Sequence, residues 1–129
     1  MQKLIKILFR DKAILVAISL TFIITYLSLK SVSHNGIVYF AHIDKVYHSI
    51  AYFSLALFWL LGFPKALDSQ MLKFGLGVAC VVFGIVIEVL QATLTAYRTA
   101  SLLDVLANAI GVAVAMMVYR YFSEKIMAI

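Results

Sequence analysis

Charged residues are scarce in this chain. They make up 13% of its 129 residues, whereas 64% are hydrophobic, and the mean hydropathy is +1.03. Soluble domains carry roughly 25% charged residues, because polar side chains must cover their cores in water. So little charge excludes an ordinary water-soluble domain. The medium around most of this surface is therefore expected to be lipid.

Cysteine, proline and acidic residues are also few. A single cysteine, Cys80, excludes an internal disulfide bond. The single proline, Pro64, is placed to end a helix, because proline lacks the N–H donor that a continuing helix needs. The 11 Lys and Arg residues outnumber 6 Asp and Glu residues, but they flank apolar runs and form no continuous groove. We therefore expect no nucleic-acid partner.

The sequence contains four long apolar runs. About 17–25 apolar residues are needed for a helix that crosses ~30 Å of hydrocarbon. The runs predict helices at about 13–29, 46–63, 74–97 and 101–122. The first run exceeds the ~7–15 residues of a signal-peptide core, so we expect it to be retained as an anchor. Short connections between the later runs favour antiparallel neighbours. The prediction is an all-α membrane protein, with residues 1–129 forming one antiparallel four-helix transmembrane bundle.

Basic residues predict the orientation of this bundle, because they are enriched on the cytoplasmic side of a membrane. With the N-terminus inside, the cytoplasmic residues are Lys3, Lys6, Arg10, Lys12, Lys65, Lys73, Arg120 and Lys125. The outer residues are then Lys30, Lys45 and Arg98. This imbalance predicts that both termini are cytoplasmic.

Polar and small residues recur at helical spacing toward the outer ends of the last three predicted helices. Residues three, four and seven apart share one helix face. The stripes are Asp44, His48 and Tyr52; Gly84, Glu88, Gln91 and Thr95; and Asp104, Asn108, Gly111 and Ala115. Small residues let helices approach, and polar residues avoid lipid, so these stripes are expected to face one another. The first helix has only Thr21, Thr25 and Ser28 at this spacing and is expected to act as a packing wall.

Glu88 is the most informative of these residues. It lies roughly a third of the way into its apolar run from the outer end, where an unpaired carboxylate costs several kcal/mol. It must therefore be paired, protonated or solvated by a cavity. Arg98 and His48 are the candidate partners.

Three blocks of sequence follow one another after the first apolar run. They are Asp44-Lys45-Val46-Tyr47-His48-Ser49-Ile50-Ala51-Tyr52, then Gly84 with Glu88-Val89-Leu90-Gln91, then Arg98-Thr99-Ala100-Ser101 with Asp104-Val105-Leu106-Ala107-Asn108-Ala109-Ile110-Gly111. Together they resemble the VanZ-like family of bacterial membrane proteins. The resemblance implies a multi-pass protein of the bacterial inner (cytoplasmic) membrane. The founding member of the family is associated with low-level resistance to teicoplanin, a lipid-tailed glycopeptide antibiotic that binds cell-wall precursors outside this membrane.

The resemblance also implies a working site on the outer side. Its candidate residues are Asp44, His48, Glu88, Gln91, Arg98, Asp104 and Asn108, with Tyr52 and Ser101 as secondary members. We expect this site to bind a lipid-linked cell-envelope molecule or a lipoglycopeptide, with Arg98 binding its anionic head group. Such binding would contribute to glycopeptide (teicoplanin) resistance. This function requires no cofactor and no metal.

Other interpretations of the same residues stay open at this point. The alternative function is a membrane-embedded metal-dependent or acid–base hydrolase or transferase acting on an envelope lipid, because Asp44 and His48 share a helix face. Ion translocation is disfavoured, because residues 55–63 and 74–84 contain no charge. A structural explanation also exists: Asp44 can cap a helix, Ser101 and Asp104 fit a capping box, and Glu88 can lock the bundle.

Overall fold

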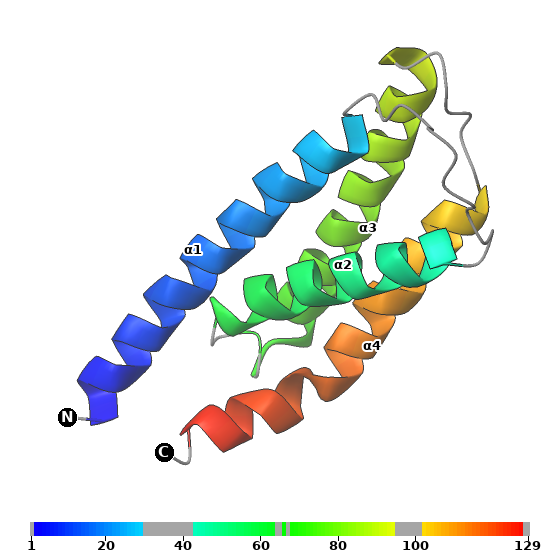
Figure 1. Ribbon diagram of the computed structural model, residues 1–129. Coiled ribbons are helices and arrows are strands. Elements are labelled where there is room, and N and C mark those ends of the chain that lie inside the picture. Colours follow the sequence, from blue (N-terminus) through cyan, green and yellow to red (C-terminus); the bar gives the residue numbers. More distant parts are fainter. Residues whose placement is uncertain (1, 30–42, 64–65, 67, 95–101, 128–129) are drawn as a thin grey trace.

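The part of the chain that the computed structural model describes, residues 2–29, 43–63, 66, 68–94 and 102–127, is all-helical apart from short turns. Its four helices are α1 (Gln2–Leu29), α2 (Ile43–Leu61), α3 (Gln70–Leu94) and α4 (Leu102–Met127) (Figure 1). The predicted helical class and the predicted order of four helices are confirmed over these residues.

Three of these helices are long and apolar enough to cross a membrane. The spans are Ile7–Leu29, Gln70–Leu94 and Leu102–Lys125. The apolar part of α2, Lys45–Leu61, is shorter. At 1.5 Å per residue it covers about 25 Å, less than the ~30 Å of a hydrocarbon core. Length and composition are therefore those of a membrane protein, while the second predicted span is a shorter helix than the other three.

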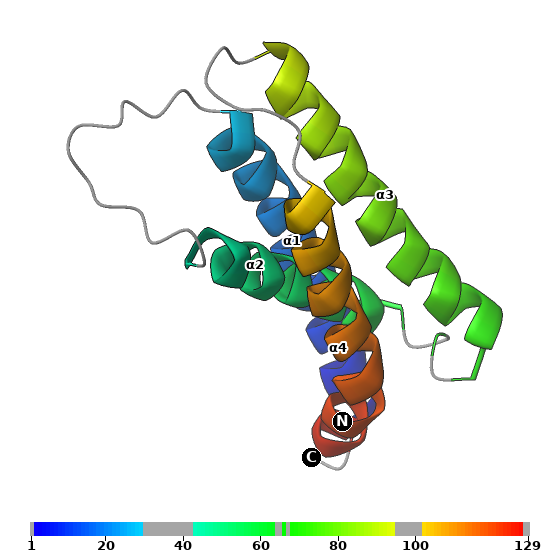
Figure 2. The same ribbon diagram turned by 90° about the vertical axis from the view of Figure 1, so that its right-hand side faces the viewer.

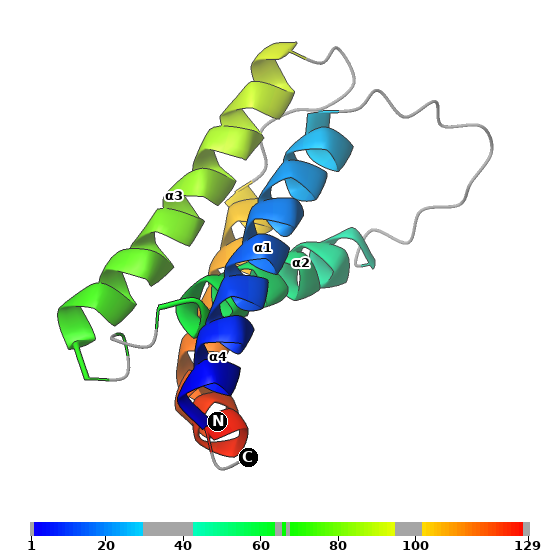
Figure 3. The ribbon, with the colours of Figure 1, turned by 90° about the vertical axis from the view of Figure 1, so that its left-hand side faces the viewer.

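Helix α2 contacts each of the other three helices. The last residues of α1 and α3 lie at one end of the molecule, and the last residues of α4 lie at the other end, beside the first residues of α1 (Figures 2 and 3). Between them α2 runs obliquely, packs most extensively on α4, and also contacts α1 and α3. This central helix contributes Tyr52, Leu55 and Ala56 to the main buried cluster, which α3 joins through Cys80 and α4 through Val112.

The ends of the helices differ from the ends of the predicted apolar runs. Helix α1 begins at Gln2, well before residue 13, and α4 continues to Met127. Charged side chains in these extensions meet solvent without interrupting the helix, as in the exposed ion pair of Arg10 and Asp11 (3.2 Å). Hydropathy therefore marks where the apolar part of a helix begins and does not mark where the helix ends.

Helix α3 begins with a side-chain cap that hydropathy does not indicate. The Ser69 hydroxyl oxygen accepts a hydrogen bond from the backbone N–H of Leu72 (3.1 Å). This bond satisfies one of the free donors at the start of a helix.

We expect Ser69→Ala to lower the free energy of unfolding by about 1 kcal/mol, because it removes this cap. The measurement is unfolding in mixed micelles followed by circular dichroism. Thr93→Val is the matched control, since the Thr93 hydroxyl donates to the carbonyl oxygens of Val89 and Leu90 within its own helix. Equal losses in the two variants would contradict a capping role.

Helices α2 and α4 approach closely at Gly111. A Cβ atom at this position would lie 2.2 Å from the Ser49 carbonyl oxygen and 3.0 Å from the Phe53 nitrogen. Ala107 and Ala115, one turn to either side, are buried as well. Small residues at this spacing let two helix backbones approach in a membrane. The structure thus confirms the packing role predicted for Gly111 and Ala115.

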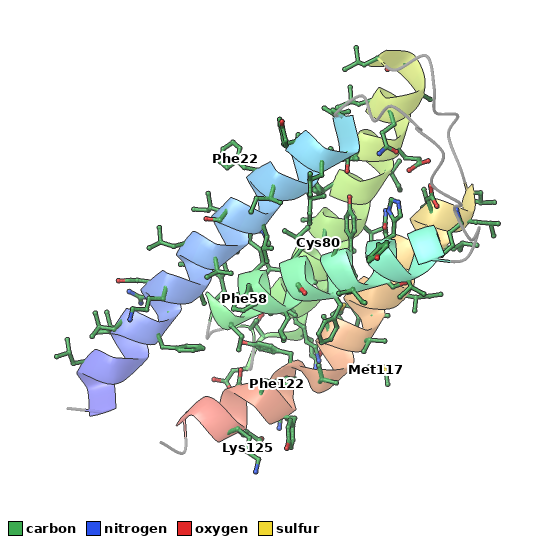
Figure 4. All side chains as sticks on the ribbon, in the orientation of Figure 1. Phe22, Phe58, Cys80, Met117, Phe122 and Lys125 are labelled. Atoms are coloured by element: carbon green, nitrogen blue, oxygen red, sulfur yellow. The ribbon has the colours of Figure 1, made fainter. Side chains whose placement is uncertain are left out.

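Large apolar side chains cover the outside of the molecule. Phe22 and Met117 point away from α1 and α4 (Figure 4) and are 72% and 79% exposed. Leu15 and Leu102, at 63% and 75%, are equally uncovered. Contiguous exposed apolar surface of this kind marks contact with a membrane or a partner. On three helices of spanning length, the matching medium is hydrocarbon.

Candidate functional site

Four polar side chains gather where the first turns of α2 and α4 meet. We call Lys45, His48, Asp104 and Asn108 the α2–α4 polar cluster. The Lys45 ammonium donates a hydrogen bond to Asp104 Oδ1. His48 Nε2 lies 3.9 Å from Asp104 Oδ2, and His48 Nδ1 lies 3.1 Å from Asn108 Oδ1. The amide oxygen can only accept, so this contact is a hydrogen bond when Nδ1 carries the ring proton.

Helical spacing brings these four residues together. Lys45 and His48 are three residues apart on α2, and Asp104 and Asn108 are four apart on α4, so each pair occupies one helix face. The Ser49 hydroxyl donates to the Ala107 carbonyl oxygen (3.0 Å) beside them and ties the two helices together. Asp104 and Asn108 are buried. Buried polar groups with such partners hold two helices in one register.

Helix α3 reaches this region through Gly84. A Cβ atom there would lie 2.9 Å from Asn108 Nδ2 and 3.1 Å from Cε1 of Tyr52. Glu88, one turn further along α3, is buried at 4% exposure, as expected of an inner face.

Gln91 connects α3 to α1. Its amide Nε2 donates to the Ser28 carbonyl oxygen (2.9 Å) near the end of α1, where carbonyl groups lack helical partners. The first helix therefore offers the site a backbone acceptor as well as a packing wall.

A cavity of about 180 Å³ opens beside the α2–α4 polar cluster, between α1 and α2. Its lining residues are Ile24, Leu27, Ser28, Tyr47, His48, Ala51 and Tyr52. We call it the polar cavity. Tyr52 is 2% exposed, and its hydroxyl has no hydrogen-bond partner among the described residues. An unsatisfied buried hydroxyl costs about 1–3 kcal/mol, so a water molecule or a ligand that reached this group would satisfy it.

The sequence-predicted residues separate into three groups. The structure brings His48, Asp104 and Asn108 together, with Tyr52 beside them at Gly84. It buries Glu88 and Gln91 on the inner side of α3, with Gln91 directed to α1. Arg98, Ser101 and the side chain of Asp44 lie outside the described residues. The pairing of Glu88 with Arg98 and the capping box at Ser101 therefore stay predictions.

Sequence reasoning missed Lys45. This residue was counted as a basic charge at the outer end of a span and within the first family-like block, but not among the site residues, whereas its ammonium pairs with Asp104. A signal was present, because Lys45 stands three residues before His48 and four before Ser49, on the face that meets α4.

His48 contacts protein groups and also lines the polar cavity. Its Nδ1 lies 3.1 Å from Asn108 Oδ1, whereas its Nε2 lies 3.9 Å from Asp104 Oδ2, beyond hydrogen-bond distance. Among the described side chains, no three His, Cys, Asp or Glu residues gather as metal ligands.

No protein-family model, curated protein or solved structure matches this chain. The cavity and the charged residues of the site are therefore the evidence for its function.

Proposed function

We propose that this chain is a VanZ-like protein of the bacterial cytoplasmic membrane, with both termini in the cytoplasm. In this proposal all four helices are embedded as an antiparallel bundle, and α2 is its short, oblique member. The excess of basic residues near the start of α1 and the end of α4 supports this orientation. The α2–α4 polar cluster and the end of α3 then belong to the outer side.

The proposed function is binding of a lipid-linked cell-envelope molecule or a lipoglycopeptide at that outer side. The polar cavity carries this proposal. Its lining joins Tyr52 and the His48 ring to the apolar side chains of Ile24, Leu27 and Ala51, and the Tyr52 hydroxyl has no hydrogen-bond partner among the described residues. A cavity with polar and apolar walls side by side fits the junction between the head group and the tail of an amphiphile.

In this proposal the positive charge that binds an anionic head group is that of Arg98. Arg98 follows α3 closely in sequence, and α3 ends at the same end of the molecule as α1. A guanidinium group binds phosphate or carboxylate through two parallel hydrogen bonds. Retention of teicoplanin or of its lipid-linked target at this site is the proposed link to glycopeptide resistance.

Tyr52→Phe tests this function most directly. We expect the variant to fold as well as the wild type, because the lost hydroxyl has no partner among the described residues. Affinity for the ligand should fall about tenfold, since a lost hydrogen bond to a charged group is worth about 1.5 kcal/mol or more. The measurement is native mass spectrometry of the protein with a polyprenyl phosphate in one arm and teicoplanin in the other.

Tyr121→Phe is the matched control, because Tyr121 is exposed on α4 and makes an edge-on contact with Phe122. It should bind both probes as the wild type does. Retention of neither probe by the wild type, or equal affinity in Tyr52→Phe and wild type, would contradict the proposed function.

A further inference from the structure

A second and larger cavity lies between α1, α2 and α3. Its volume is about 290 Å³, and its lining residues are Thr21, Leu55, Trp59, Phe63, Leu76, Ala79, Cys80 and Phe83. We call it the apolar cavity. Cys80, one of the labelled side chains in Figure 4, is buried within the core at this level of α3. Neither the α2–α4 polar cluster nor the proposed head-group contacts use these residues.

The lining offers a ligand almost no polar group. The Trp59 indole N–H donates to Thr21 Oγ1 (3.2 Å), and the Thr21 hydroxyl donates in turn to the Ala17 carbonyl oxygen (2.8 Å). Both polar side chains in the lining are thereby occupied by protein partners. Cavities without free polar groups do not hold ordered water and take apolar ligands instead. The chemistry therefore favours a hydrocarbon occupant.

The apolar cavity neighbours the polar cavity along two helices. On α1, Ile24 lines the polar cavity and Thr21 lines the apolar one, three residues earlier. On α2, Tyr52 and Leu55 are related in the same way, so the two cavities are adjacent along both helices. The boundary includes Tyr52 and Phe83, whose ring centroids lie 6.0 Å apart.

We propose that the apolar cavity holds an acyl chain of the same amphiphile whose head group occupies the polar cavity. This proposal rests on the proposed function and extends it to the tail of the ligand. The apolar cavity lies about one helical turn deeper than the polar cavity when measured from the start of α2. The acyl chain of a lipid whose head group lies at the outer side also points deeper into the membrane. The polar cavity therefore matches the head group, and the apolar cavity matches the chain.

Trp59 is the only tryptophan in the sequence and lines this cavity, so tryptophan fluorescence reports on the cavity. Bromine atoms on an acyl chain quench tryptophan fluorescence on contact. The protein is reconstituted in phosphatidylcholine vesicles that contain a small fraction of chain-brominated lipid. Brominated phosphatidic acid, which has an anionic phosphate head, is compared with brominated phosphatidylcholine at the same fraction. We expect stronger quenching of Trp59 by the phosphatidic acid.

Cavity-filling variants identify the place of contact. Ala79→Leu and Leu76→Phe add volume to two successive turns of α3 that line the apolar cavity, and each should reduce the quenching by about half or more. Ala113→Leu adds the same volume at an exposed position of α4 outside this lining and should leave the quenching unchanged. Circular dichroism checks that all variants are folded.

The outcomes separate this proposal from the proposed function. Quenching that is insensitive to both cavity-filling variants would overturn the acyl-chain site, even if polyprenyl phosphate binding were lost in Tyr52→Phe. Equal quenching by both brominated lipids that disappears in Ala79→Leu would keep the acyl-chain site and contradict recognition of the head group.

Discussion

Gly111→Ala is expected to lower the free energy of unfolding by about 3 kcal/mol, near the upper end for an overpacked core. The added methyl group would lie 2.2 Å from the Ser49 carbonyl oxygen and 3.0 Å from the Phe53 nitrogen. Both obstacles are backbone atoms of α2, so no side-chain rotation can relieve the contact. The helices α2 and α4 must separate instead, and the bond from the Ser49 hydroxyl to the Ala107 carbonyl oxygen (3.0 Å) lies beside this contact.

The control for this variant is Gly75→Ala. An added Cβ atom at Gly75 meets no atom within 4 Å, so the change should alter the free energy of unfolding by less than about 1 kcal/mol. Both variants are unfolded in mixed micelles and followed by circular dichroism. A Gly111→Ala protein as stable as Gly75→Ala would show that α2 and α4 do not pack as described.

Gly77→Ala provides an intermediate case for the same comparison. Its added Cβ atom would lie 2.5 Å from the Met116 sulfur, but this sulfur belongs to a long and flexible side chain that can move away. Which atoms surround a glycine therefore decides its importance. The sequence alone does not distinguish these three glycines. The way the helices cross decides which atoms surround each one.

The helical membrane fold was predictable because it follows from composition along the chain. Long apolar runs have few structures open to them in lipid, and the helix satisfies every backbone group internally. The tilt and length of α2 were not predictable in this way. The hydropathy of residues 46–63 does not depend on the angle of the helix to its neighbours. Packing against the other three helices sets that angle.

The candidate site was predictable in part for a related reason. Spacing identifies which residues share a helix face, and the buried positions of Glu88, Asp104 and Asn108 agree with it. Spacing does not say which neighbouring helix each face meets. Gln91 thus bonds to the end of α1, and Lys45 joins Asp104, because the crossing of the helices places those partners within reach.

Lys45→Met is expected to cost about 3 kcal/mol of unfolding free energy, because it leaves the Asp104 carboxylate without its ammonium partner. The side chains of Lys45 and Asp104 are only 30% and 12% exposed, so water replaces the lost contact poorly. Arg10→Met is the matched control within the same chain. It breaks an ion pair whose side chains are 44% and 56% exposed, and it should cost less than about 0.5 kcal/mol.

The double variant Lys45→Met/Asp104→Asn tests the cause of this loss. It removes both charges, keeps a polar side chain beside His48, and should recover at least about half of the stability lost in Lys45→Met. The free energies of unfolding of the two single variants and the double variant give the coupling between the charges. If Lys45→Met costs no more than Arg10→Met, or if the double variant recovers nothing, the charge pair does not hold α2 against α4. The polar cavity would then depend on the close packing at Gly111 and on the His48–Asn108 contact instead.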